Sequence, residues 1–262
     1  WSSFIKMIPI KTELEIQAMR TVCTIAANVL HQMCELVAPG INTYDLDQEG
    51  RRLISNYGAK SACFGYRIGN NRFPSHTCLS TNEEVVHGIG KLNRVLHEGD
   101  IISVDVCVEY NGYIGDNART VGVGTISESL SLLLARTESA LHKGISKALG
   151  GNRVGAISHA IERFIQAYGY GIIRDFVGHG VGRSIHEAPQ VPNFGPRFAG
   201  PKLRPGMTLA IEPMVAAGTG KIRILNDGWT AVTADMRPSA HFEHTVLITD
   251  SQPEILTTPD LD

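Results

Sequence analysis

The chain has 262 residues, and its 24 lysines and arginines nearly balance its 26 aspartates and glutamates, which gives a formal net charge of −2. This length can bury a large core, while the balanced charge gives no indication of a nucleic-acid-binding or membrane-surface protein. The five cysteines are scattered without a CxxC pair. No apolar run approaches the roughly 20 residues that span a bilayer, and the N-terminal residues lack the features of a secretory signal. We therefore expect a cytoplasmic protein without disulfides.

The first elements predicted along the chain are two helices. Thr12 and Glu15 have the form of a capping box. Apolar residues then recur at helical spacing until Pro39-Gly40, where the first helix is expected to end. A second helix is predicted from Thr43 to Tyr57-Gly58.

The same layout returns later in the chain. A helix with its apolar positions between Leu130 and Ile145 is followed by a second one that ends at Tyr168-Gly169. Gly40 aligns with Gly151 at an offset of 111 residues, and at the same offset "RRLISNYG" lies over "ERFIQAYG". A short match in the same order as a repeated helix pair indicates a duplicated half.

Segments with strand character follow each helix pair. We predict strands at 84–89, 101–120, 206–216, 221–233 and 241–249. Two helix pairs packed against antiparallel strands from two halves make an α+β protein. The stretch "QVPNFGPRFAGPKLRPG", residues 190–206, is rich in proline and glycine, which predicts a surface loop or a crossing connection.

The stretch "IISVDVCVEYNGYIGDNART", residues 101–120, is typical of two strands joined at Asn111-Gly112. An Asn-Gly pair between strand-like residues is the strongest short signal for a type I′ hairpin turn. In that register Cys107 opposes Asp116, and Asp105 projects from the same face as both. The Cβ atoms of the two aspartates are then diagonal neighbours, roughly 7–8 Å apart. Two carboxylates aimed at one buried place predict a site for divalent cations, whereas Cys107 is expected only to fill space.

Other stretches offer further ligands. "LAIEPMV" places Glu212 in an apolar strand that ends at a proline, and "HFEHTVLIT" places Glu243 at the head of another strand. "VVHGIG" and "GHGVGRSIHEAP" present His87, His179 and His186 in glycine-containing stretches, and glycines allow a close approach of the backbone to another group. Each feature has an ordinary alternative, because strand aspartates are commonly salt-bridge partners and such histidines are commonly hydrogen-bonded loop residues. The four carboxylates together favour the metal site.

Six motifs occur in a fixed order: "SACFGY", "NEEVVHGIG", "DVCVEYNGYIGD", "GHGVGRSIHEAP", "LAIEPMV" and "FEHTVLIT". In this order they resemble the type I methionine aminopeptidases, of the pita-bread fold shared with prolidase and aminopeptidase P. The resemblance runs from about Thr12 to Asp250. It implies an α+β pita-bread fold in which two pseudo-symmetric halves pack helix pairs on a curved antiparallel sheet. It also implies a single metallopeptidase domain over 1–262, with a short N-terminal extension (1–11) and halves of about 12–122 and 123–250.

The resemblance also implies roles for five metal ligands. Asp105 resembles the chelating ligand of one divalent ion, and His179 and Glu212 resemble the ligands that complete a second. Asp116 and Glu243 resemble carboxylates that bridge both ions. Two such ions lower the pKa of a bound water and hold it as a nucleophile. Four carboxylates and one imidazole favour Mn(II), Fe(II) or Co(II), with Zn(II) as a further candidate.

Substrate contacts follow from the same resemblance. His87 and His186 match histidines that contact the scissile peptide, and Glu212 also matches a proton shuttle. The methionine pocket maps to Cys63, Tyr66, Phe73, Cys78, Ile185 and Trp229. The segment from Tyr66 to Phe73 is longer than in the shortest family members and Ile185 stands where phenylalanine is common, so one pocket wall is expected to differ. Asn82 and Ser239, with a carbonyl near Glu84, match a monovalent-cation site.

The implied activity is metal-dependent removal of the N-terminal methionine from nascent proteins and peptides whose second residue is small. The expected partners are nascent polypeptide N-termini, including those at the ribosome, and the protein is expected to be a cytoplasmic monomer that recognises neither nucleic-acid sequence nor membrane. Two alternatives remain. A metallopeptidase of the same fold that removes residues before proline is disfavoured by the short N-terminus, "SACFGY" and Trp229. A non-catalytic binding module is disfavoured because all five ligand types are present.

Overall fold

A computed structural model describes residues 7–260 of the chain, so residues 1–6 of the predicted N-terminal extension lie outside the described part. The helices are α1 Glu13–Glu35, α2 Thr43–Asn56, α3 Glu128–Ile145 and α4 Val154–Gln166. The strands are β1 Lys60–Ser61, β2 Arg67–Ile68, β3 Asn71–Arg72, β4 Cys78–Thr81, β5 Glu84–Val86, β6 Ile101–Tyr110, β7 Tyr113–Gly122, β8 Gly171–Ile172, β9 Gly178–Gly180, β10 Glu187–Val191, β11 Thr208–Ile211, β12 Met214–Ala216, β13 Ile222–Ile224, β14 Ala231–Thr233, β15 Ser239–His241, β16 Glu243–Leu247 and β17 Glu254–Ile255.

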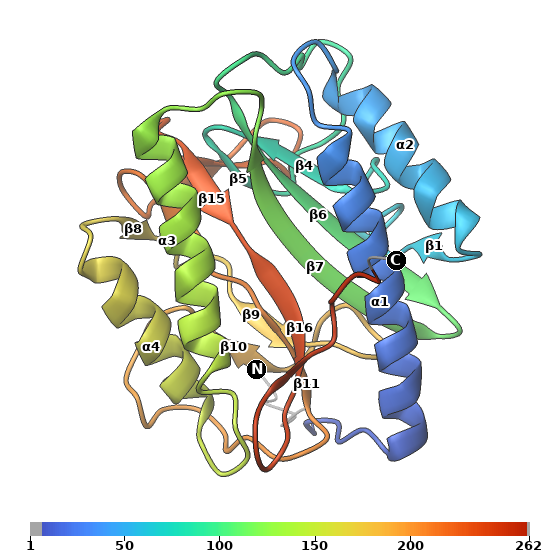
Figure 1. Ribbon diagram of the computed structural model, residues 1–262, viewed down its shortest axis with the longest axis vertical. Helices are drawn as coiled ribbons and strands as arrows, with labels where there is room; N and C mark the ends of the chain where they lie inside the picture. The colour runs from blue at the N-terminus through green and yellow to red at the C-terminus, as the bar shows by residue number, and fades with distance from the viewer. Residues whose placement is uncertain (1–6, 261–262) are drawn as a thin grey trace.

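The main sheet joins the two halves of the chain. Its strand order is β1-β6-β7-β16-β11-β9-β10, with β4 also paired to β6 and β17 to β16, and every pairing within it is antiparallel. The seam is the contact of β7 with β16, where Glu243 pairs with Ala118 and His244 with Asn117 (Figure 1). A strand from each half thus meets at the centre of the sheet.

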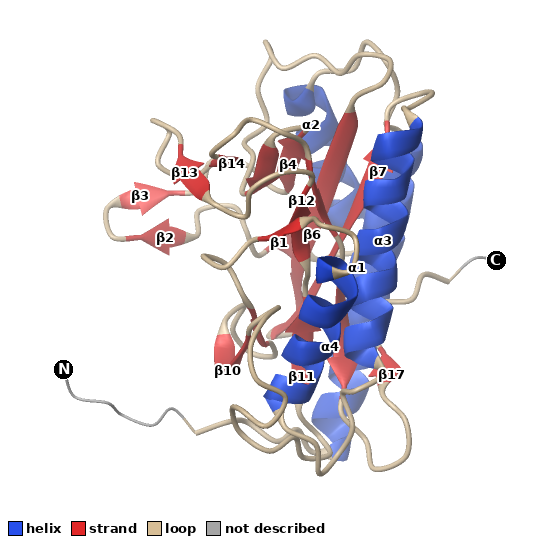
Figure 2. Cartoon of the chain, turned by 90° about the vertical axis from the view of Figure 1, so that its left-hand side faces the viewer, coloured by secondary structure: helices blue, strands red, loops and turns tan. Residues whose placement is uncertain are grey.

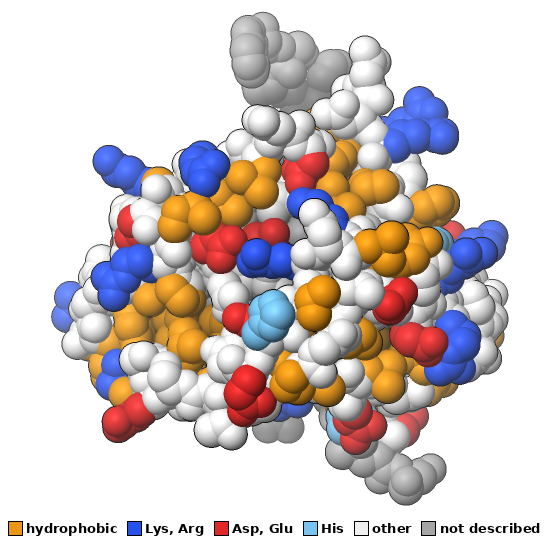
Figure 3. All heavy atoms as spheres, turned by 90° about the horizontal axis from the view of Figure 1, so that it is seen from above, with side chains coloured by type: hydrophobic (Ala, Val, Ile, Leu, Met, Phe, Trp, Pro, Cys, Tyr) orange, Lys and Arg blue, Asp and Glu red, His pale blue; other side chains and the backbone are white. Residues whose placement is uncertain are grey.

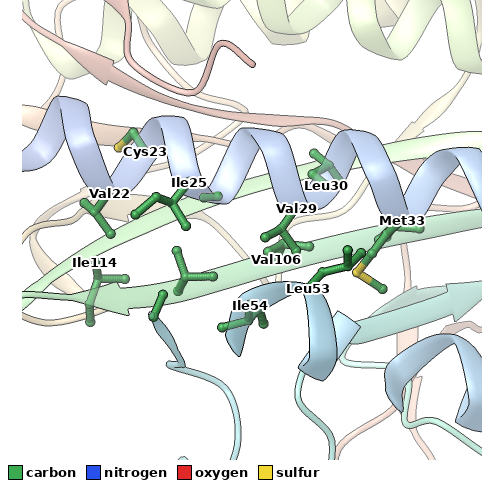
Figure 4. Packing of buried hydrophobic residues seen from close by; sticks show 14 of the residues in the cluster. Val22, Cys23, Ile25, Val29, Leu30, Met33, Leu53, Ile54, Val106 and Ile114 are labelled. Atoms are coloured by element: carbon green, nitrogen blue, oxygen red, sulfur yellow. The ribbon is translucent and has the colours of Figure 1, made fainter. Parts of the chain in front are cut away.

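All four helices lie on one side of this sheet, and the β2–β3 hairpin projects on the other side (Figure 2). Helix α1 packs on β6 and β7, and its apolar face is buried with α2 (Figure 4). The approach is close at Gly115 of β7, because a Cβ atom there would lie 2.6 Å from the carbonyl oxygen of Val22. The helix layer therefore leaves the other face of the sheet free for the pocket described below.

The predicted repeat of a helix pair is confirmed. The capping box of Thr12 and Glu15 is present at the start of α1. Gly40 and its aligned partner Gly151 have φ angles of +96° and +87°. Gly58 and Gly169, which follow the second helix of each pair, have φ angles of +67° and +73°. These left-handed conformations favour glycine, so the aligned glycines mark the same turns in both halves.

Four predicted strands are wrong in extent. The predicted strand 84–89 ends at Val86, because His87 has a φ of +60°. Strand β11 ends at Ile211, and β12 continues in a separate sheet of order β15-β12-β8. The predicted strand 221–233 is two strands, β13 and β14, and the predicted strand 241–249 starts at the end of β15 and continues as β16. In 206–216 and 241–249 the chain leaves one sheet for another, whereas β13 and β14 pair with each other in a single sheet. Periodicity alone shows neither a change of sheet nor such an interruption. The segment 190–206 begins in β10 and then runs irregularly, held by backbone hydrogen bonds near the start of α4.

The distribution of charged side chains on the surface agrees with the nearly equal numbers of acidic and basic residues. Acidic and basic side chains are interspersed on the face seen from above in Figure 3. Within residues 7–260, no helix combines the length and the apolar character needed to cross a membrane. All five cysteines are free thiols, as predicted.

Candidate metal centre

The hairpin of β6 and β7 has the predicted register. Tyr110 pairs with Tyr113 and Cys107 pairs with Asp116. The two turn residues, Asn111 and Gly112, have φ angles of +52° and +77°, as a type I′ turn requires. Asp105 and Asp116 therefore share one face of the hairpin, as the sequence predicts, and that face lines a pocket.

The second half brings three more side chains to this face. His179 is the middle residue of β9, between β11 and β10, where it pairs with Ala210 and Gln190. Glu212 directly follows β11, and Glu243 is the first residue of β16.

The glycines beside His179 have a packing reason. A Cβ atom at Gly178 would overlap the carbonyl oxygen of Ala210, and one at Gly180 would overlap that of Ala188. Only glycine allows the three strands to pack this closely around the histidine.

The five predicted ligands form one buried cluster. Nε2 of His179 lies 3.3 Å from Oε1 of Glu212 and 3.9 Å from Oδ2 of Asp116. One ligand atom each from Asp116, His179 and Glu243 lie within 4.8 Å of one another, and so do atoms from Asp105, Cys107 and Asp116. The two groups share Asp116, so they form two adjoining candidate sites.

The buried carboxylates of the cluster would be stabilised in their ionised form by a nearby positive charge. Burial, reinforced by neighbouring carboxylates, raises the pKa of Asp105 and Glu243 well above their usual range, and burial does the same for Glu212. Burial and the charge of Glu212, opposed by a hydrogen bond from Cys107, raise the pKa of Asp116 to about 8. Four neighbouring buried carboxylates cannot all stay ionised without a counter-charge.

The tautomer of His179 supports the same conclusion. Nδ1 lies 2.9 Å from the carbonyl oxygen of Gly180, which can only accept, so Nδ1 carries the proton. Burial and the neighbouring His186 lower the pKa of His179 to about 4, so the ring is neutral at pH 7. The lone pair of Nε2 therefore faces the carboxylates of Glu212 and Asp116. Lone pairs facing one another are stabilised by a cation between them, and the residues fit a metal ion.

Two further observations concern single atoms. Oε1 of Glu243 is buried and has no hydrogen-bond partner among the described residues, as expected of an atom that awaits a ligand. Cys107 does more than fill space, which corrects the prediction. Its Sγ lies 2.7 Å from Oδ1 of Asp116 and 3.7 Å from Oδ1 of Asp105.

An apolar pocket adjoins the carboxylates. The residues predicted for substrate contact all line it: Cys63, Tyr66, Phe73, Cys78, His87, Ile185, His186 and Trp229. The rings of Phe73 and Trp229 pack edge to face with centroids 5.3 Å apart. The hydroxyl of Tyr66 lies 2.9 Å from Nδ1 of His186, which fixes the orientation of that ring. The structure brings these residues together, while their roles stay predictions.

His87 occupies a constrained position at the pocket. It follows β5 with a φ of +60°, which is uncommon for a residue other than glycine. Its ring packs edge to face on Phe176, with centroids 5.2 Å apart. Burial lowers the pKa of His87 to about 4, so the ring is neutral at pH 7. Unusual backbone conformations concentrate at functional sites, so the conformation of His87 supports its predicted role in substrate contact.

The residues predicted for a monovalent cation lie apart from the pocket but close to one another. The backbone N–H of Ser239 donates to the carbonyl oxygen of Asn82 at 2.9 Å, and its hydroxyl donates to that of Glu84 at 3.1 Å. The side chain of Asn82 is also hydrogen-bonded, to Ile101 and Asp100. The cation site stays a prediction.

Sequence reasoning missed several residues of the pocket: Ile68, Val86, Phe176, Val177 and His241. His241 is two residues before Glu243, and alternation along the strand was the signal that could have found it. It also missed the buried ion pair of Lys11 and Glu187, which fastens the segment that carries His186.

Comparison with known proteins agrees with this geometry. The model of metallopeptidase family M24 matches residues 17–250. The chain belongs to this family. Within M24, it is 47% identical over 251 residues to a methionine aminopeptidase of Clostridium acetobutylicum, an alignment that covers 96% of this chain and 99% of the relative.

Solved structures of M24 proteins extend the comparison. A methionine aminopeptidase from Thermotoga maritima superposes with a TM-score of 0.93 at 43% identity, covering 96% of this chain and 100% of that one. Prolidase from Pyrococcus furiosus, at 24% identity, superposes with a TM-score of 0.76 over 96% of this chain and 66% of its own. The predicted α+β pita-bread fold and the predicted membership among type I methionine aminopeptidases are confirmed.

Proposed function

We propose that this M24 protein removes the N-terminal methionine from nascent proteins and peptides whose second residue is small, with two divalent metal ions as cofactors. The observation that carries the proposal is the neutral His179, whose Nε2 lone pair faces the carboxylates of Glu212 and Asp116 at 3.3 and 3.9 Å. An apolar pocket adjoins this cluster, and the chain is similar to methionine aminopeptidases.

The five clustered residues would hold the metal ions. Asp105 and Asp116 would bind the first ion, and His179 and Glu212 would bind the second, with Asp116 and Glu243 shared between both. When bound, the ions supply Lewis acidity, which lowers the pKa of water and polarises a carbonyl group. The oxygen-rich ligand set favours Mn(II), Fe(II) or Co(II), with Zn(II) as a further candidate.

The protein side chains around the scissile bond have separate tasks. The neutral ring of His87 and that of His186 each carry one N–H, which can donate to the oxygen or the amide of the scissile peptide. With the Tyr66 hydroxyl donating to Nδ1 of His186, Nε2 of that ring would carry the proton and would face the substrate. Glu212, whose pKa is raised by burial, can take a proton and return it to the leaving amine.

The apolar pocket would select methionine. Cys63, Cys78, Phe73 and Trp229 surround a space in which a thioether makes favourable contacts with sulfur and aromatic rings. Ile185 also lines this space, and its side chain is smaller than the phenylalanine common at that position in the family. The β2–β3 hairpin adds Ile68 to the pocket wall, so this longer segment would contact the bound peptide.

The cellular setting follows from the substrate. The protein would act as a cytoplasmic monomer on the N-termini of nascent chains, including those at the ribosome. A monovalent cation near Asn82, Glu84 and Ser239 would add rigidity to the strands beneath the pocket. Neither the fold nor the charge distribution gives a reason to expect nucleic-acid sequence recognition.

A direct test uses two peptides and one chelator. The purified protein, loaded with Mn(II) or Co(II), should release methionine from Met-Ala-Ser, and chelation should abolish the release until metal is restored. A peptide of the form Xaa-Pro serves as the matched alternative substrate. Preferential release from Xaa-Pro would contradict the proposed specificity, and absence of any bound divalent metal would contradict the mechanism and favour a binding module.

A further inference from the structure

His241 is a buried histidine of the pocket without a role in the mechanism above. It ends β15, is 2% exposed, and its side chain lines the cavity. Its Nε2 atom lies 3.7 Å from Oε2 of Glu212 and has no hydrogen-bond partner among residues 7–260. A buried polar atom without a partner costs free energy, so Nε2 calls for a partner in the working enzyme.

The backbone of His241 is fixed from two sides. Its N–H donates to the hydroxyl oxygen of Thr120 at 2.8 Å, and that hydroxyl also lies 2.8 Å from its carbonyl oxygen. On the other side, His241 pairs with Met214 of β12, two residues after Glu212. Strand β15 is therefore tied both to β7, which carries Asp116, and to the segment that carries Glu212. The imidazole is held facing this carboxylate.

Glu212 presents its two oxygens to two different histidines. Oε1 lies 3.3 Å from Nε2 of His179, and Oε2 lies on the side of His241. A neutral imidazole has one N–H to donate. The separation of 3.7 Å exceeds the usual N–H···O distance of about 2.9 Å, so a small movement of either side chain closes the hydrogen bond.

We propose that His241 is a positioning residue, whose Nε2–H donates to Oε2 of Glu212 and holds that carboxylate with Oε1 toward His179. The inference rests on the proposed metallopeptidase function, which gives the orientation of Glu212 its purpose. Groups that orient a metal ligand from behind change metal affinity or activity by about 10–100-fold when they are removed.

Two substitutions at this position separate a positioning role from a packing role. His241→Leu removes the donor and leaves an apolar side chain, whereas His241→Gln keeps an N–H donor of similar reach. In the manganese-loaded protein, His241→Leu should lower kcat for Met-Ala-Ser and the Mn(II) affinity by about 10–100-fold, with KM little changed. His241→Gln should recover most of both losses. His97→Leu, at an exposed histidine, is the matched control and should behave as the unmodified protein.

Calorimetry with Mn(II) gives a readout that does not depend on turnover. A His241→Leu protein with normal kcat and normal Mn(II) affinity would overturn the proposal, and so would a His241→Gln protein no better than His241→Leu. If the unmodified protein releases no methionine, the proposed function fails, while the comparison of Mn(II) affinities still decides the role of His241. Thermal unfolding identifies a variant that does not fold, and in that case His241→Gln and its affinity carry the test.

Discussion

The two halves of the molecule hold their parts of the candidate metal centre in different ways. In the first half, Asp105 and Asp116 belong to one hairpin whose strands pair continuously over ten residues each. In the second half, His179, Glu212 and Glu243 stand in or beside strands of three to five residues, two of them where the chain passes between sheets. A long ladder holds the first pair in place, whereas close packing of short segments holds the other three.

This difference predicts how backbone substitutions in each half affect the candidate metal centre. A continuous ladder distributes a local disturbance over many hydrogen bonds, and the hairpin is also covered by α1. The short strands of the second half have few pairs each, so a disturbance there moves the side chain that the strand carries. We therefore expect backbone changes in the first half to lower stability first, and those in the second half to weaken the metal centre first.

The largest expected effect comes from removing one ligand charge in either half. Asp105→Asn and Glu243→Gln should each reduce turnover of Met-Ala-Ser by at least about 1,000-fold, because each removes one charged ligand from a bound cation. The circular dichroism spectrum should stay unchanged, since replacing one of several crowded buried carboxylates with an amide relieves repulsion. Initial rates and metal analysis measure the loss of turnover and of bound metal. Near-normal activity in either variant would show that its half does not contribute to a shared centre.

A matched pair of glycine substitutions tests the contrast itself. Gly115→Ala, in β7, should destabilise the fold by about 1–3 kcal/mol because its Cβ would press on Val22 of α1. Gly180→Ala, beside His179, should instead weaken Mn(II) affinity by about 10–100-fold as β9 moves away from Ala188. Denaturant unfolding and calorimetry measure the two effects. Equal losses of metal affinity in both variants would remove the distinction between the halves.

The same contrast explains how far the sequence predicts the site. Asp105 and Asp116 could be placed on one face because Asn111-Gly112 determines the register of a hairpin. The alternation of side chains along each strand then determines which residues share a face. The interruptions at Glu212 and Glu243 could not be predicted, because the chain changes sheets there and only tertiary packing specifies that change. The resemblance named these residues as ligands, but it did not show how the backbone delivers them.

Contacts between distant segments are the other part that sequence reasoning missed. Lys11 is paired at 2.6 Å with Glu187, which lies 176 positions away, and no local pattern connects the two. His241 had no signal apart from its alternation with Glu243. Such contacts depend on the assembled fold. The helices and the hairpin were therefore predictable, while the ion pair that supports the segment carrying His186 was not.

The buried ion pair gives a prediction of intermediate size. The side chains of Lys11 and Glu187 are 5% and 12% exposed, and Oε1 of Glu187 accepts hydrogen bonds from the N–H groups of Arg183 and Ser184. Lys11→Met leaves the carboxylate unpaired, which costs about 3–5 kcal/mol for a buried pair. The segment that carries His186 should loosen, so kcat should fall by about tenfold without loss of metal. Initial rates and metal analysis check this.

The control for the ion pair removes both charges. In Lys11→Met/Glu187→Gln, the amide oxygen can still accept from the backbone while no unpaired charge remains, so stability and kcat should recover in part. No recovery in the double variant would indicate that Lys11 acts through its packing against Gly182 and not through Glu187.

The smallest effect is expected at Asp227, which fixes the loop before β14 in the second half. Oδ1 of this residue accepts from the N–H groups of Trp229 and Thr230 at 3.0 and 2.8 Å, and Oδ2 lies 3.1 Å from Nζ of Lys91. Burial alone would raise the pKa of Asp227, but these hydrogen bonds lower it to about 2. A carboxylate with a lowered folded-state pKa stabilises the fold fully above its unfolded value of about 3.9, and this contribution is lost as the pH falls toward 2.

Asp227→Asn should therefore lower the free energy of unfolding by about 1 kcal/mol at pH 7. The difference from the unmodified protein should persist down to about pH 4 and shrink below it. Because Trp229 lines the apolar pocket, KM for methionyl peptides should rise while kcat changes little. Denaturant unfolding between pH 3 and 7, together with steady-state kinetics, tests both parts. A stability difference that is independent of pH would show that Asp227 acts through its shape alone, and the loop of the second half would then be held by packing and not by its charge.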